Sequence, residues 1–86
     1  MQGRKLVGYN LRRIRVGKDV SQEQLAFDAG VDRSYLGGIE RGAENPSVDT
    51  LEKIAAILVV EIRDFFDPMN GEENQTGLRP GRKPSR

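Results

Sequence analysis

The stretch S-Q-E-Q-L-A-F-D-A-G-V-D-R-S-Y-L-G-G-I-E-R, residues 21–41, predicts a helix, a tight turn and a second helix. Ser21 is followed three residues later by Gln24, which is the spacing of a capping box, so a helix should begin directly after Ser21. Gly30 should end this helix, because glycine enters the left-handed conformation at little steric cost. The carboxylate of Asp32 can then cap the first amides of the next helix. The sequence therefore predicts two short helices that meet at a steep angle.

A helical wheel of the second helix separates an apolar side from an outward side. Leu36 and Ile39 share the side that should pack against the rest of the protein. The outward side holds two arginines, small residues and no acidic residue: Arg33, Ser34, Gly37, Gly38 and Arg41. Such a face suits close approach to a polyanion, although a plain solvated helix face would show the same periodicity.

Three segments of the chain resemble one known family. They read Q-x-x-L-A, then G-V with R-S-Y-L-x-x-I-E-R-G, and finally N-P-S-x-x-T-L-x-x-I-A. Over residues 6–66 they are similar to the Cro/C1-type (XRE) helix-turn-helix transcriptional regulators, and D-R-S-Y-x-x-G-I-E-R is also similar to restriction-modification controller proteins. The resemblance implies an all-α, compact five-helix domain of the lambda-repressor-like type, with a central helix-turn-helix that binds double-stranded DNA.

The chemistry available to the chain is limited, because it contains no cysteine and no histidine. Disulfides, thiolate metal sites and the commonest general base are therefore absent, and we expect neither an enzyme nor a bound metal or cofactor. The longest apolar run, residues 54–60, is too short to cross a bilayer, and the N-terminal residues show no signal-peptide pattern. The expected protein is cytoplasmic, of bacterial or phage origin, and associated with the nucleoid.

The net charge of +1 conceals an uneven distribution along the chain. Residues 1–18 contain six basic and no acidic residues, residues 19–73 contain four basic and thirteen acidic ones, and residues 74–86 contain four basic and no acidic ones. Basic ends therefore flank an acidic body. Against this body, Arg33 and Arg41 make the outward face of the second motif helix locally positive.

Residues 5–18 are predicted to form a first helix. Its buried stripe has apolar residues at i, i+4 and i+7: Val7, Leu11 and Ile14. In the resembling family, the arginine that matches Arg15 pairs with the glutamate that matches Glu40, and the resemblance implies the same ion pair here. The sequence leaves open whether the pair is exposed and worth under about 1 kcal/mol, or buried, where losing one partner costs several.

A fourth helix should begin after Ser47, which can cap it. Val59 stands where family members usually have glycine, and Glu61 stands where a serine-like cap is expected, so the end of this helix is blurred. A short fifth helix is expected over residues 62–66, before Pro68. The domain should comprise residues 1–69, and residues 70–86 should form a disordered basic tail.

Apolar residues are dense between Ile57 and Phe66, where they fill seven of ten positions. Some should face a partner, although all seven could instead complete the core of a monomer. We expect a homodimer, because one module reads few base pairs and two modules on a palindromic operator supply the rest. The predicted dimer interface is Val59, Val60, Ile62, Phe65 and Phe66.

The resemblance also implies roles in DNA binding. The residues matching base-reading positions are Arg33, Ser34, Gly37 and Gly38, and those matching contacts to the DNA backbone are Gln22, Arg41 and Asn45. The two glycines depart from the family pattern, which usually has side chains there, and together they cost about 2 kcal/mol of helix propensity. Close approach of the helix backbone to DNA would offset that cost; drift at a permissive position is the alternative.

Two questions remain open from the sequence. The tail ends in R-P-G-R-K-P-S-R, which faintly resembles an AT-hook and could lie along phosphates or in a narrow minor groove, but the favoured interpretation is an idle solubilising segment. An alternative function for the same fold is an antitoxin or adaptor, with the apolar C-terminal cluster as its docking face for a protein partner. Binding to DNA that weakens steeply with salt would favour the regulator.

Overall fold

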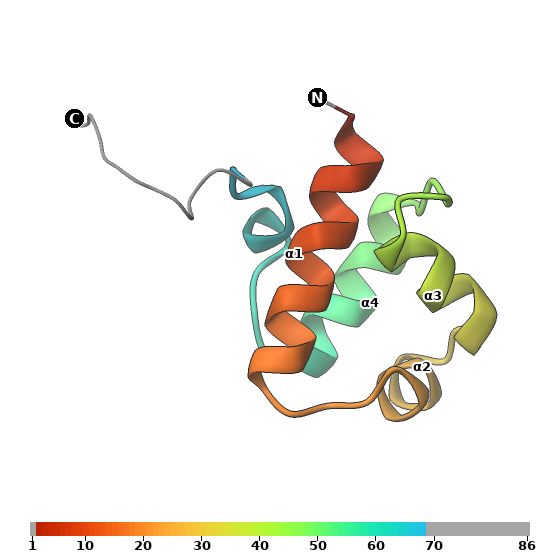
Figure 1. The fold of residues 1–86 in the computed structure, drawn as a ribbon. Helices are drawn as coiled ribbons and strands as arrows, with labels where there is room; N and C mark the ends of the chain where they lie inside the picture. The colour runs from red at the N-terminus through yellow and green to blue at the C-terminus, as the bar shows by residue number, and fades with distance from the viewer. Residues whose placement is uncertain (1, 69–86) are drawn as a thin grey trace.

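The computed structural model describes residues 2–68, which form four α-helices followed by one 3-10 helix (Figure 1). The elements are α1 (Gly3–Gly17), α2 (Gln22–Ala29), α3 (Arg33–Glu40), α4 (Val48–Leu58) and η1 (Ile62–Phe66). The all-α class is confirmed. The fifth helix is a 3-10 helix, a form typical of short pieces, and the amide of Asp64 donates to the carbonyl of Glu61 at 2.9 Å. The predicted domain end at residue 69 and the basic tail, residues 70–86, lie outside the described residues.

The predicted caps define the two helices of the motif. The Ser21 hydroxyl accepts from the amide of Gln24 at 2.9 Å, and the Asp32 carboxylate accepts from two first-turn amides at 3.1 and 3.3 Å. Gly30 ends α2 in the left-handed conformation, with φ of 71°. Only half of the capping box forms at the start of α2, because the Gln24 side chain donates to Asp28 at 2.9 Å.

Helix α1 lies between α3 on one side and η1 on the other (Figure 1). Gly8 brings α1 against α3 so closely that a Cβ atom there would lie 2.4 Å from the Ile39 carbonyl oxygen. On the opposite side, the buried Asn10 side chain donates to the carbonyls of Phe65 and Asp67 at 3.0 and 2.8 Å. These contacts place α1 as the element that sets the position of both neighbours.

The core is a single apolar cluster to which every element contributes. Its buried members are Val7, Leu11, Leu25, Ala26, Ala29, Leu36, Ile39, Leu51, Ile54, Ala55, Leu58 and Phe65. In residues 2–68, no helix is both long enough and apolar enough for a membrane span. Because buried residues of both α2 and α3 belong to the apolar core, the core fixes the two helices relative to each other.

The end of α4 confirms that Val59 replaces a residue suited to the left-handed region. Val59 adopts φ of 59° and ψ of 48°, and its side chain is 81% exposed. A side chain with a Cβ costs about 1 to 2 kcal/mol in this conformation. The helix thus ends where glycine was expected, at a conformational cost that glycine would avoid.

Candidate nucleic-acid interface

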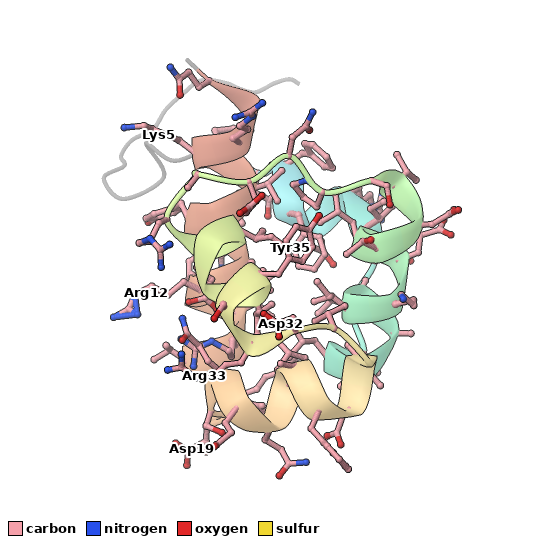
Figure 2. All side chains as sticks on the ribbon, turned by 90° about the vertical axis from the view of Figure 1, so that its right-hand side faces the viewer. Lys5, Arg12, Asp19, Asp32, Arg33 and Tyr35 are labelled. Carbon is pink, nitrogen blue, oxygen red and sulfur yellow. The ribbon has the colours of Figure 1, made fainter. Side chains whose placement is uncertain are left out.

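The first turn of α3 presents two predicted base-reading residues to solvent. Arg33 and Ser34 are both exposed, directly after the Asp32 cap. Tyr35 is the third residue of this turn; it is partly buried and packs against the core. Figure 2 shows Arg33 projecting from the start of α3 toward the side on which the α1 cations lie. The start of α3 is therefore accessible to a ligand, while Tyr35 packs it against the core.

A buried ion pair anchors α3 to α1, as the resemblance implied. Arg15 Nε donates to Glu40 Oε2 at 2.6 Å, and Arg15 Nη2 donates to Glu40 Oε1 at 3.0 Å. The two side chains are only 9% and 3% exposed. A third donor of the same guanidinium, Nη1, reaches the carbonyl of Val20 at 2.8 Å. The pair, which the sequence left open as exposed or buried, is therefore buried. Losing one partner should lower the stability of the fold by several kcal/mol, on the order of 3 to 5, because the other charge would remain buried without a counter-charge.

The side chain of Gln22 has a contact within the protein that was not predicted. Its Nε2 donates to Glu40 Oε1 at 2.9 Å, so the amide group belongs to the Arg15–Glu40 network. The amide nitrogen carries two N–H donors and this bond uses one of them, so the phosphate grip of the side chain stays a prediction. The backbone amide of Gln22 lies in the first turn of α2, and a phosphate contact through that amide stays a prediction.

The two glycines of α3 occupy different environments. A Cβ atom on Gly37 would lie 3.4 Å from Arg41 Nη1 and 3.8 Å from Gln22 Oε1, which are ordinary contacts. A Cβ atom on Gly38 would lie 2.6 Å from Glu44 Cγ.

Gly38 is therefore corrected as a residue of the open face. The loop after α3 folds back over it, since the amides of Ala43 and Glu44 donate to the Gly38 carbonyl at 2.8 and 3.3 Å. This return of the loop offers a reason for a small residue that does not involve DNA. Gly37 is buried as well, with the Arg41 guanidinium and the Gln22 side chain beside it, so the expectation of an open position is wrong for both glycines. A part of Gly37 in base reading stays a prediction.

The other two residues predicted to contact the DNA backbone lie beyond the middle of α3. Arg41 caps the end of the helix and is exposed, but its guanidinium folds back beside Gly37. Asn45 is exposed in the loop before α4, where it lines a shallow groove with Arg4 and Phe66. Arg41 thus shares the α3 face with Arg33, whereas Asn45 borders a separate depression.

The predicted dimer surface divides into buried and exposed members. Phe65 is 0% exposed in the core of the protomer, so its assignment to a dimer interface is wrong. The physical reason is that adjacent residues of any helix point about 100 to 120° apart, so Phe65 and Phe66 cannot both face the same side. Val59 and Phe66 remain exposed, at 81% and 47%, whereas Val60 and Ile62 are partly buried against the core.

Sequence reasoning missed two residues of α1 that fix the positions of its neighbouring elements. Gly8 permits the close contact between α1 and the end of α3, and Asn10 fastens η1 to the other side of α1. The helical pattern of α1 does not reveal the partner of either residue, because both partners are distant in the sequence.

Comparison with known proteins places this geometry among DNA-related regulators. A helix-turn-helix family model matches residues 11–65. Control protein C.BamHI of Bacillus amyloliquefaciens is 45% identical over 65 residues, which cover 74% of this chain and 80% of that protein. The crystal structure of the restriction-modification controller protein C.AhdI from Aeromonas hydrophila has a TM-score of 0.71 at 46% identity, covering 73% of this chain and 96% of that one. SinR, the master regulator for biofilm formation, crystallised in complex with DNA, has a TM-score of 0.68 at 40% identity over 71% of this chain and 98% of that one.

Proposed function

Because this chain belongs to the XRE-type helix-turn-helix family, we propose that it regulates transcription by binding a palindromic operator in double-stranded DNA as a homodimer. Helix α3 enters the major groove, and the N-terminus of α2 lies against the adjacent phosphates. A protein with this function works in the cytoplasm of a bacterium, where its operator is. The proposal names no operator sequence and no direction of regulation.

The observation that carries this proposal is the exposed face of α3. Arg33 and Ser34 stand on its first turn and Arg41 on its end, while the opposite side of the helix is buried in the core. An arginine at the helix start can donate two hydrogen bonds to O6 and N7 of guanine. The buried pair of Arg15 and Glu40 holds the helix from behind, so this face needs no reordering before it meets DNA.

A dimer is proposed from apolar side chains on α4 and η1 that the protomer does not cover. Val59 and Phe66 are exposed, and Val48, at the start of α4, is 62% exposed. Phe66 and Val48 line the same shallow groove, whereas Val59 lies at the other end of α4, about 17 Å away along an 11-residue helix. An interface through these residues therefore runs along the length of α4.

The first experiment selects bound sequences from a random duplex pool and then measures affinity for the selected duplex at several salt concentrations. We expect a palindromic consensus and a steep loss of affinity with salt, because phosphate contacts release counterions. Selection that yields no consensus would remove sequence-specific binding from the proposal. Tight binding to another protein, without binding to DNA, would instead favour the antitoxin or adaptor alternative.

The second experiment tests the dimer with two matched substitutions. Phe66→Glu should give a monomer in sedimentation analysis and much weaker operator binding, because a charge is buried in the proposed interface. Phe27→Glu is the control, since Phe27 is 81% exposed and lies on the side of α2 opposite to the buried Leu25 and Ala29. A monomeric unaltered protein at concentrations that saturate the operator would refute the dimer, as would an equal effect of both substitutions.

A further inference from the structure

Helix α1 carries positive charge that the proposed α3 interface does not use. Within Gly3–Gly17 there is no acidic residue, and five residues are basic: Arg4, Lys5, Arg12, Arg13 and Arg15. Arg15 is neutralised by Glu40, whereas the other four are exposed. A helix with four exposed cations and no acid attracts a polyanion if those cations face it.

Contacts between α1 and α3 show which way Lys5 and Arg12 face. Gly8 and Arg15 are the residues of α1 that touch the end of α3. At about 100° per residue, Arg12 lies roughly 40° and Lys5 roughly 60° from Gly8 around the helix, both on the side away from the core. Lys5 Cγ lies only 2.9 Å from the position of a Cβ atom on Gly42, so its stem crosses the chain just after α3.

The two cations therefore border the α3 face. Figure 2 shows Lys5 and Arg12 projecting toward the same side of the domain as Arg33. Gly42 directly follows Arg41, so a sugar-phosphate strand that passes Arg41 next meets Lys5. Two acidic residues flank Gly42 in sequence: Glu40 is occupied by Arg15, and Glu44 lies over Gly38.

We infer that Lys5 and Arg12 form a second row of phosphate contacts, supplied by α1 beside the recognition helix. This inference rests on the proposed binding of DNA and extends its footprint beyond the residues of α2 and α3. Both side chains end in donors that phosphate oxygens can accept from, and both lie on α1, outside the helix proposed to enter the major groove, which suits contact with phosphates rather than with base edges. Their contribution is thus to affinity and register, without choice of sequence.

Arg13 provides a matched control on the same helix. It is adjacent to Arg12 but turns toward η1, where its Nη2 donates to Asn10 Oδ1 at 2.9 Å and lies 3.9 Å from Asp67 Oδ2. Replacing Arg12 or Arg13 by glutamine removes the same charge from neighbouring positions. The two positions differ in the direction of the side chain relative to α3 and in the contacts of Arg13 with Asn10 and Asp67.

The experiment measures the affinity of Lys5→Gln, Arg12→Gln, Arg13→Gln and the unaltered full chain for the selected duplex and for random duplexes, between 50 and 200 mM salt. Each lost phosphate contact should lower the salt slope by about 0.9 per subunit, so the fall in affinity over this range should shrink by about 3-fold per subunit. We expect this change for Lys5→Gln and Arg12→Gln on both kinds of duplex, with the preferred sequence unchanged. Arg13→Gln should leave the slope as it is.

Three outcomes would overturn the inference. Equal changes in all three variants would indicate a general effect of net charge, unchanged slopes in Lys5→Gln and Arg12→Gln would show that α1 does not touch DNA, and an altered base preference would place these residues in the groove. Thermal unfolding of each variant confirms that the folded protein is being compared. Failure of the unaltered protein to bind any duplex would refute the proposed function itself. The measurement on the unaltered protein distinguishes this result from the three outcomes above.

Discussion

The close approach of α1 to α3 at Gly8 predicts that Gly8→Ala is strongly destabilising. A Cβ atom at Gly8 would lie 2.4 Å from the carbonyl oxygen of Ile39 and 2.6 Å from that of Glu40. Carbon and oxygen atoms in such contacts normally stay about 3.3 Å apart, so α1 and α3 would have to separate by roughly 1 Å. Both obstructing atoms belong to the backbone and cannot rotate away as a side chain would.

The expected size of the effect follows from two opposing terms. Alanine in place of a mid-helix glycine stabilises a helix by about 1 kcal/mol, whereas overpacking a core costs about 1 to 3 kcal/mol and sometimes more. Because the obstruction is backbone, the second term should lie at its upper end, which leaves a net loss of about 2 kcal/mol. For a domain of this size each kcal/mol lowers the melting temperature by about 4 to 8 °C. The separation would also lengthen the bonds between Arg15 and Glu40, which span the same two helices.

The assay compares Gly8→Ala with Gly17→Ala by thermal and urea unfolding. Gly17 is the last residue of α1, and nothing lies within 4 Å of a Cβ atom placed there. The same substitution should therefore stabilise the protein at Gly17, by about 0.5 to 1 kcal/mol, and destabilise it at Gly8. A Gly8→Ala variant that is as stable as the Gly17→Ala variant would refute the close contact between α1 and α3.

Three further predictions concern the site and its support. Arg33→Ala should cost about 1 to 3 kcal/mol of binding free energy on the preferred duplex and relax the preference at one base pair per half-site. Arg41→Ala should weaken binding to all duplexes alike and lower the salt slope by about one per subunit. Equal losses of affinity for Arg33→Ala on every duplex would contradict its assignment to base reading. Glu40→Ala should lower the free energy of unfolding, measured in urea, by about 3 to 5 kcal/mol because it strands the charge of Arg15, and a loss below about 1 kcal/mol would show that the pair behaves as an exposed one. Val59→Gly should raise the melting temperature of dilute protein by relieving about 1 kcal/mol of backbone strain, and a lower melting temperature would contradict the left-handed end of α4.

The sequence by itself determined the features that depend on neighbours along the chain. Ser21, Gly30 and Asp32 marked the ends of the two motif helices, because caps act over three or four residues and their donors and acceptors are adjacent in sequence. Apolar periodicity identified Val7 and Leu11 of α1 and Leu36 and Ile39 of α3 as core residues, because it too depends on spacing along the chain. The pairing of Arg15 with Glu40 spans 25 residues, and it was anticipated only through the family resemblance.

Tertiary structure alone decided features that depend on how segments far apart in sequence approach one another. The side-chain amide of Gln22 donates to Glu40, a contact that the sequence did not predict, because packing brings the start of α2 beside the end of α3. Phe65 and Phe66 look alike in sequence, yet one is buried and the other exposed, because adjacent residues of a helix point about 100 to 120° apart and packing against α1 and α4 decides which of the two faces the core.

The same distinction applies to the glycines. Gly38 is covered by the returning loop, and Gly8 is closed in by backbone oxygens more than 30 positions away in the chain. A local pattern reports which residues can turn inward, since that depends on periodicity. It does not report how near two backbones come, because that distance is set by the packing of all five elements at once.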